Sequence, residues 1–346
     1  MLREDNPKEY IRNEFINPGE YWRIRCVDMD QYANRTGIII GDKNINNQLA
    51  KNLKTGDIEF EKFKINYAAA AARGYKRRSP KNNKEENNKE EKNINCDMIA
   101  IAEVTSSAIF AVLDGVGTTE ATRRHTINLA KAITNPNFNL EAQTENDLDQ
   151  NRLEINTGAC ISMVQITKNL LLEETHAGDT KTLVLRYNTS KKTYEIQFYS
   201  DLDNVAYKAF NGGKITVQQY NNHRERNYIT NFIRAGDIGC EEPQREGLLE
   251  SESAYGGLEL EDNDIVLMFS DGIDDNFTHG EILNIVNEHQ DQGPEEILRA
   301  ISEAQYNRVT FKATKKKPND GYKKRAKQDN VSAICLRIEG KGKVNN

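Results

Sequence analysis

The stretch AIFAVLDGVGTTEATRR, residues 108–124, contains an apolar run, a glycine-rich turn and the start of a helix-type pattern. A short, wholly apolar run that ends at a glycine is typical of a strand buried on both faces. Asp114 ends this run, so its carboxylate is expected to emerge at the edge of a sheet. The following residues predict a helix over 118–133, since four side chains recur on one face: Ala121, His125, Leu129 and Ala132.

Strand-type runs recur on both sides of this stretch and are separated by turns. They cover residues 97–104, 159–166, 180–187, 192–199, 264–272 and 330–338. Helical periodicity returns at residues 279–290 and 294–309, where Pro294 suits a first helical turn. Strands that neighbour one another in sequence, with helices arriving in blocks, favour an antiparallel α+β fold over a doubly wound parallel sheet.

The composition excludes two classes of partner. Of the 346 residues, 47 are basic and 53 acidic, and the net charge of -6 gives the whole chain no attraction for nucleic acid or anionic membranes. No run is apolar enough for a membrane helix, and the first residues lack the apolar core of a signal peptide. We therefore expect a soluble protein that is cytoplasmic or exported without a conventional signal peptide. Its five cysteines form no C-x-x-C pair, which indicates buried, reduced thiols.

Three segments outside the strand-rich region differ from it in texture. Residues 76–93, KRRSPKNNKEENNKEEKN, carry no hydrophobic side chain and are expected to form a charged, flexible insertion. Residues 1–75 contain no catalytic motif, although the five alanines of FEKFKINYAAAAARGY, residues 60–75, predict a helix. The basic stretch at 312–327 is interpreted as a solvated loop, with a local docking site for anions as the alternative.

Four aspartates lie at or beside the ends of apolar runs: Asp97, Asp114, Asp271 and Asp329. A single aspartate of this kind, above all before a glycine, is more typical of a turn or a helix cap. Four in the same setting would converge in a shared cleft and repel one another unless they are protonated, paired or bound to a cation. Ligand sets made only of oxygen suit Mg²⁺ or Mn²⁺, and a pair of such ions can activate water for attack on a phosphate ester.

The same stretches carry a family resemblance. AIFAVLDGVGTTEATRR resembles the Asp-Gly-x-Gly segment of the PPM family, the metal-dependent serine/threonine protein phosphatases of type 2C. The family's later motifs are resembled, in order, by TGACISMVQI (157–166), ETHAGDTKTLVLRY (174–187), LEDNDIVLMFSDGIDD (260–275) and KQDNVSAICLRI (327–338).

The resemblance spans residues 94–338 and implies an α-β-β-α sandwich of two antiparallel sheets flanked by helices. It divides the chain into a phosphatase-like catalytic domain (94–340), the charged insertion (76–93) and an N-terminal segment (1–75). No role is assigned to that N-terminal segment beyond packing on the core.

Carried over by motif, the resemblance implies catalytic roles for Asp114 and Asp271. Asp114 would bridge two ions, Mg²⁺ or Mn²⁺, and the Gly115 carbonyl would bind one of them. Asp179, in the turn Gly178-Asp179-Thr180, could help hold a third ion. The full set of implied metal ligands is Asp97, Asp114, Gly115, Asp179, Asp271 and Asp329.

The first acidic motif departs from the family pattern. Asn95-Cys96-Asp97 matches it best and places Cys96 where the family has a carboxylate. A competing match lies in the charged insertion at Asn83, Glu85 and Glu86. The two registers predict different sites, one with Asp97 as a metal ligand and one without it.

Phosphate binding and proton donation are also less clear than in the family. Lys92 fits the position of the family's phosphate-binding arginine in the first register, and Arg77 or Arg78 fits it in the second. Lysine lacks the two-pronged geometry of arginine. Val116 replaces a histidine found in many members, so a bound water or another acid would protonate the leaving group. The five histidines form no metal or nucleophile motif, and we expect His125 and His176 to be packed.

The leading functional hypothesis is a phosphatase that removes phosphate from serine or threonine of a protein substrate by water activated by two metals. One alternative keeps the metals but changes the group removed, for example to AMP or phosphocholine. The other is an inactive pseudophosphatase that binds partners, but the retained acids favour an enzyme. The sequence indicates neither the substrate protein nor the oligomeric state.

Overall fold

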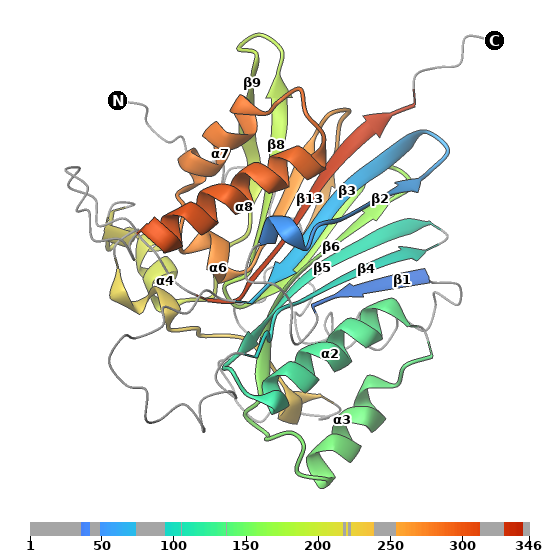
Figure 1. Ribbon diagram of the computed structural model, residues 1–346, viewed down its shortest axis with the longest axis vertical. Coiled ribbons are helices and arrows are strands. Elements are labelled where there is room, and N and C mark those ends of the chain that lie inside the picture. The colour runs from blue at the N-terminus through green and yellow to red at the C-terminus, as the bar shows by residue number, and fades with distance from the viewer. Residues whose placement is uncertain are drawn as a thin grey trace.

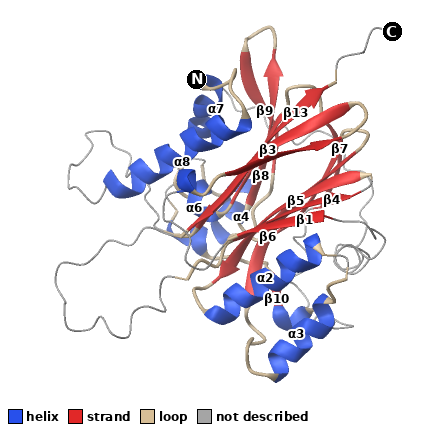
Figure 2. Ribbon diagram, turned by 45° about the vertical axis from the view of Figure 1, so that its right-hand side comes forward, coloured by secondary structure: helices blue, strands red, loops and turns tan. Residues whose placement is uncertain are grey.

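Two antiparallel β-sheets lie face to face, with helices on the outer face of each (Figure 1). The computed structural model describes residues 36–41, 49–73, 94–104, 106–135, 137–216, 219–220, 223–238, 254–311 and 329–341. Figure 2 shows the strands between two helix pairs, α2 (Glu120–Thr134) with α3 (Leu140–Asp149) and α7 (His279–Glu288) with α8 (Pro294–Phe311). The predicted α-β-β-α sandwich is confirmed.

In the described residues, the first sheet has seven strands in the order β1-β4-β5-β6-β7-β11, with β10 paired to β6. Their bounds are Thr36–Ile40 (β1), Met98–Val104 (β4), Ser107–Val116 (β5), Gly158–Thr167 (β6), Leu171–Ala177 (β7), Ile233–Arg234 (β10) and Ala254–Glu259 (β11). The second sheet has six strands in the order β2-β3-β13-β12-β8-β9. Their bounds are Lys54–Glu59 (β2), Phe63–Ala72 (β3), Lys181–Asn188 (β8), Thr193–Tyr199 (β9), Ile265–Phe269 (β12) and Val331–Gly340 (β13).

Short helical turns complete the described chain: η3 (Leu49–Lys51), α4 (Val205–Asn211), η6 (Arg224–Asn227), η7 (Ala235–Asp237) and α6 (Asp271–Asp274). Of the helices that the structure describes, none combines bilayer-spanning length with a sufficiently apolar sequence.

Three hydrophobic layers hold the sandwich together. Phe110 of β5, Ile65 of β3 and Met268 of β12 belong to the core between the sheets. A second cluster packs the outer face of the second sheet against α7 and α8, and a third packs the first sheet against α2. Burial of apolar surface in these layers is the main force that holds the sheets and helices together.

The helix predicted at the five-alanine run is wrong. Residues 63–72 form β3, which pairs with β2 on one side and along its whole length with β13 on the other. Ala69 and Ala71 face the core between the sheets, whereas Ala68, Ala70 and Ala72 belong to the cluster under α8. Burial on both faces of a central strand therefore overrides the helix propensity of alanine.

Strands β1 to β3 come from residues 36–72, and they contribute to both sheets. For this stretch the sequence predicted no role beyond packing on the core. β1 pairs with β4 and β3 pairs with β13, so the strands of residues 36–72 are part of the sandwich that carries the predicted catalytic motifs.

The other three predicted helices are found close to their predicted bounds. Thr119 caps the N-terminus of α2 by accepting a hydrogen bond from the Thr122 N–H at 3.1 Å. Thr278 and Glu281 form a reciprocal capping box at the start of α7. Pro294 begins α8, where proline's missing N–H costs no helical hydrogen bond.

The described cysteines and histidines also agree with prediction. Cys96, Cys160 and Cys335 are free and buried, while Cys26 and Cys240 lie outside the described residues. His125 and His176 are both buried, at 0% and 1% exposure.

Candidate metal centre

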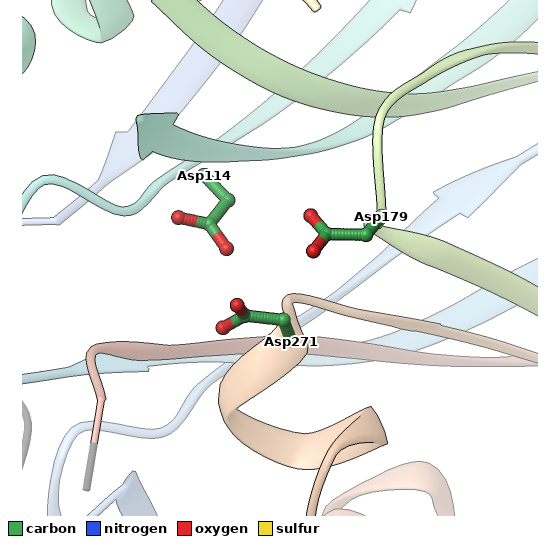
Figure 3. A group of neighbouring side chains, drawn as sticks. All are labelled: Asp114, Asp179 and Asp271. Carbon is green, nitrogen blue, oxygen red and sulfur yellow. The ribbon is translucent and has the colours of Figure 1, made fainter. Parts of the chain in front are cut away.

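Three aspartates from three different connections meet at one end of the sandwich (Figure 3). Asp114 lies near the end of β5, Asp179 lies in the turn between β7 and β8, and Asp271 begins α6, separated from β12 by Ser270 alone. Each offers a carboxylate oxygen within 4.8 Å of the others. We call these three residues the aspartate cluster.

Asp114 is placed by the pleat of the first sheet. It lies opposite Cys160 in the pairing of β5 with β6. Because side chains alternate along a strand, Asp114 shares a face with Val112 and Phe110, which belong to the core between the sheets. The Asp114 carboxylate therefore faces the space between the two sheets, next to Val112 at the end of the strand.

Asp179 is placed by a turn that requires glycine. Gly178 has a φ of +104°, and a Cβ at this position would overlap the sulfur of Cys160. The turn is held from both sides, since Nε2 of His176 lies 2.8 Å from the Thr180 carbonyl and the Asp203 N–H donates to the Gly178 carbonyl at 2.7 Å. Asp179 is 4% exposed.

Asp271 is fixed by the link between β12 and β13. The Ser270 N–H donates to the Ser332 carbonyl at 2.9 Å, and the Ser332 N–H donates to Ser270 Oγ at 2.9 Å. Gly272 packs against the Asn330 carbonyl so closely that a Cβ would overlap it. The residue after Asp271 must therefore be small for α6 to start at this position.

Asp97 and Asp329 flank the aspartate cluster. Asp97 is 1% exposed and accepts a hydrogen bond from Ser332 Oγ at 3.0 Å. Asn330, next to Asp329, donates through its amide to the Ile94 carbonyl at 3.1 Å, which ties the Asp-Asn pair to the segment before Asp97. All five predicted aspartates thus lie in one region, three of them within 4.8 Å of one another.

Gly115 has a packing reason to be glycine. A Cβ there would come within 2.6 Å of the Thr122 side chain and 2.7 Å of the Cys96 side chain. Cys96, found where the family motif has a carboxylate, thus packs beside Gly115, the residue after Asp114. Burial raises the pKa of its thiol to about 12, and the neighbouring Asp97 adds to this shift.

The electrostatics of the cluster suit a cation. Burial raises the pKa of Asp114 well above its usual value, and Asp97, Asp271, Asp179 and Asp329 raise it further. Converging carboxylates of this kind either keep protons or bind positive charge. The donors are all carboxylate oxygens, which are the ligands that Mg²⁺ and Mn²⁺ prefer. The residues present therefore fit a divalent cation.

Several predicted site residues cannot be placed. The candidate phosphate ligands Lys92, Arg77 and Arg78 lie outside the described residues, as does the competing acidic match at Asn83, Glu85 and Glu86. The basic stretch at 312–327 lies outside them too.

The comparison with known proteins rests on structure. No family model matches the sequence, and no curated protein matches it. The serine/threonine phosphatase PstP/Ppp of Mycobacterium tuberculosis is similar over 80% of this chain and 99% of its own, at 16% sequence identity and a TM-score of 0.51. The chain has the PPM phosphatase fold.

Two further solved structures of serine/threonine phosphatases are similar to this chain. One is the catalytic domain of PstP in complex with two manganese ions (17% identity; 80% of this chain and 98% of that one; TM-score 0.48). The other is the serine/threonine phosphatase of S. agalactiae (14% identity; 79% and 98%; TM-score 0.49).

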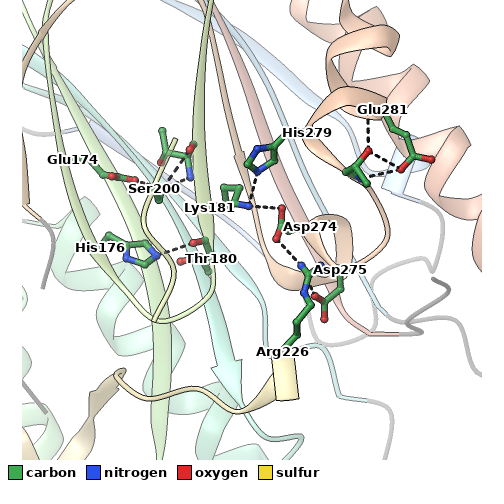
Figure 4. Close-up of polar contacts among 12 residues, drawn as sticks. Glu174, His176, Thr180, Lys181, Ser200, Arg226, Asp274, Asp275, His279 and Glu281 are labelled. Atoms are coloured by element: carbon green, nitrogen blue, oxygen red, sulfur yellow. Dashed lines mark hydrogen bonds and ion pairs between the residues drawn. The ribbon is translucent and has the colours of Figure 1, made fainter. Parts of the chain in front are cut away.

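Sequence reasoning missed a group of charged residues behind the aspartate cluster in this PPM fold. Lys181, Arg226 and Asp274 form a buried network of ion pairs (Figure 4). Lys181 and Asp274 lie within the quoted motifs, two and three residues after predicted metal ligands, but they were not singled out. Arg226 lies in a segment without any motif, and only its three-dimensional contacts identify it.

Proposed function

We propose that this chain is a metal-dependent phosphatase that hydrolyses phosphoserine and phosphothreonine in proteins. The observation that carries the proposal is the meeting of Asp114, Asp179 and Asp271 within 4.8 Å in a chain with the fold of a serine/threonine phosphatase. A purely structural turn would need none of these three carboxylates to face the other two.

The cofactor in this proposal is Mg²⁺ or Mn²⁺. Two ions would bind, and the acids could hold a third. Asp114, Asp271, Asp97, Asp329 and the Gly115 carbonyl would hold the pair, and Asp179 would contribute to the third. When bound, such ions supply Lewis acidity and a nucleophile at neutral pH.

The chain's own residues have defined tasks in this proposal. Asp114 must give up any bound proton before a cation binds, because burial and then four neighbouring acids raise its pKa. The substrate phosphate would be bound by Lys92, Arg77 or Arg78, which supply positive charge from the insertion. Val116 provides no proton, so the leaving group must take its proton from water or from another acid.

The test is hydrolysis of an aryl phosphate and of phosphoserine and phosphothreonine peptides by the full chain with Mn²⁺. We expect turnover that is lost with a chelator and in Asp114→Asn, which keeps the shape of the side chain but removes its charge. Asp147→Asn is the matched control, since Asp147 is a fully buried carboxylate of α3 that accepts from Asn128 at 3.0 Å, outside the cluster. It should retain full turnover.

Parallel assays with AMP-modified and phosphocholine-modified peptides distinguish the alternatives. Turnover of these alone would assign the chain to another phosphate-linked modification. Mn²⁺ binding without turnover of any of these substrates would indicate a pseudophosphatase, and both results would contradict the proposed function.

A further inference from the structure

The segment that follows β9 forms a small unit of its own beside the aspartate cluster. Leu202, Ala206, Tyr207 and Tyr220 make a separate hydrophobic cluster. The ends of the unit are joined by backbone hydrogen bonds, with the Thr230 N–H donating to the Asp203 carbonyl at 2.7 Å. Asp203 and Arg226 are therefore held in one structural unit.

Asp203 connects this unit to the turn that carries Asp179. Its N–H donates to the Gly178 carbonyl at 2.7 Å, and its carboxylate accepts from the Gly178 N–H at 3.2 Å. Asn231 donates to the same carboxylate at 3.3 Å. Asp203 thus bonds both backbone groups of Gly178, the residue before Asp179: its N–H binds the carbonyl and its carboxylate binds the N–H.

Arg226 connects the same unit to the helical turn that carries Asp271. Its Nη2 lies 3.1 Å from Oδ2 of Asp274 and 2.9 Å from Oδ1 of Asp275 (Figure 4). The guanidinium lies over the ring of Tyr220, 4.5 Å from its centroid. Among the described residues its Nε and Nη1 have no hydrogen-bond partner, so its polar contacts go to α6 and the residue that follows it.

Asp274 links the segment after Asp179 to Arg226, since it contacts both Lys181 and Arg226. Lys181, two residues after Asp179, places its Nζ 2.8 Å from Oδ1 of Asp274 and 2.8 Å from Nε2 of His279. Although burial opposes ionisation, Lys181 and Arg226 lower the pKa of Asp274 to about 2. Burial lowers the pKa of Lys181, and Asp274 offsets part of this shift. Because Asp274 receives two cations, we take it as ionised.

A network of this kind is a poor source of stability. Removing charged groups from water costs about as much as their mutual attraction returns, and an apolar replacement is often as stable. The two guanidinium nitrogens that have no partner among the described residues add to the cost. What such a network does provide is geometry, because each partner fixes the position of the others.

We propose that Asp203 and Arg226 are positioning residues that set the spacing between Asp179 and Asp271, and thereby the affinity of the cluster for divalent cations. The inference rests on the proposed function, since it takes Asp179 and Asp271 as cation ligands. Groups that orient metal ligands typically change metal affinity about 10- to 100-fold when they are removed.

The experiment is calorimetric titration of the full chain with Mn²⁺, with thermal melting of the same samples in chelator. Arg226→Met keeps the length of the side chain and removes its charge, and Asp203→Ala removes the bond to the Gly178 N–H. We expect each to weaken Mn²⁺ binding about 10-fold or more. Arg226→Lys can still reach Asp274 and should recover most of the affinity.

Arg186→Met is the matched control. Arg186 bonds Asp264 through Nη2 at 2.8 Å and lies at the other end of β8 from Lys181. The Arg186→Met substitution should lower the melting temperature. It should leave Mn²⁺ affinity within about twofold of wild type, since distant sites are independent.

Two results would overturn the inference, and they have different meanings. If Arg226→Met and Asp203→Ala melt earlier but bind Mn²⁺ as wild type does, both residues are purely structural and the proposed function still stands. If wild type itself binds no Mn²⁺, the proposed function falls and this inference falls with it. Should Arg226→Met not fold, Asp203→Ala tests the same structural unit, and Mn²⁺ binding by that variant at wild-type affinity would overturn the inference.

Discussion

Asp114 lowers the stability of the metal-free fold, because its carboxylate is buried close to other carboxylates. Four other carboxylates raise its pKa, on top of burial. In a metal-free protein such repulsion favours unfolding, where the acids separate. An apolar or amide side chain would remove this penalty, and the chain nevertheless has an acid at each of these strand ends. The arrangement is understandable as a site for positive charge and hard to explain as packing.

The register of the first acidic motif can be tested at a single residue. Asp97 is buried and bonded to Ser332 Oγ at 3.0 Å, and it contributes to the raised pKa of Asp114. We expect Asp97→Asn, which can still accept that bond, to weaken Mn²⁺ binding by about 10-fold or more in a calorimetric titration. The double substitution Glu85→Ala/Glu86→Ala should bind as wild type does. The reverse ranking would move the site into the charged insertion.

His125 should make the stability of the fold depend on pH. Burial lowers its pKa to about 4, from 6.5, although the bond of Nε2 to the Ile233 carbonyl acts in the other direction. Because the folded pKa is the lower one, the unfolded chain takes up the proton first. Stability is therefore complete above pH 6.5 and is lost as the pH falls toward 4.

Between pH 7 and pH 4.5 this residue should cost the fold about 2 kcal/mol. Urea unfolding of wild type and of His125→Gln at the two pH values measures it, because glutamine can donate to Ile233 without titrating. Equal pH dependence in the two proteins would contradict the prediction.

Among the secondary-structure elements, the sequence predicted correctly those whose conformation depends on residues close together in the chain. Asp114 and Asp271 each follow an apolar run, and the apolar spacing that predicts the helix of residues 118–133 lies within that helix. The five alanines of β3 were predicted wrongly because their conformation depends on β13, which pairs with all five from the far end of the chain. Arg226 could not be found for the same reason, since Asp274 lies 48 residues further along the chain.

The alanines of β3 should be intolerant of larger side chains. Ala69 is 0% exposed and faces the core between the sheets. We expect Ala69→Leu to lower the free energy of unfolding by about 1–3 kcal/mol through overpacking. Thr55→Leu, at an exposed position of the neighbouring strand β2, should change it by no more than about 0.5 kcal/mol. Urea unfolding of the two variants checks this, and a tolerant Ala69 would mean that the two sheets can separate locally.

For the molecule as a whole, the predicted ligands come from both sheets. Asp97 and Asp114 adjoin strands of the first sheet, Asp271 and Asp329 adjoin strands of the second, and Asp179 lies in the connection between them. A cation bound by this set would have to be released before the two sheets could come apart. Its binding energy would then stabilise both sheets and not only the turns that touch it.

Mn²⁺ should therefore protect the two sheets to the same degree. At a hundredfold excess over its dissociation constant, a ligand that binds only the folded state adds about 2.7 kcal/mol to the free energy of unfolding. Native-state hydrogen exchange should show this increment equally for amides of β5 and of β12, and Asp114→Asn should show none at the same Mn²⁺ concentration. Protection that rises in β5 alone would mean that the ion is held by the first sheet only, with Asp271 left out of the site.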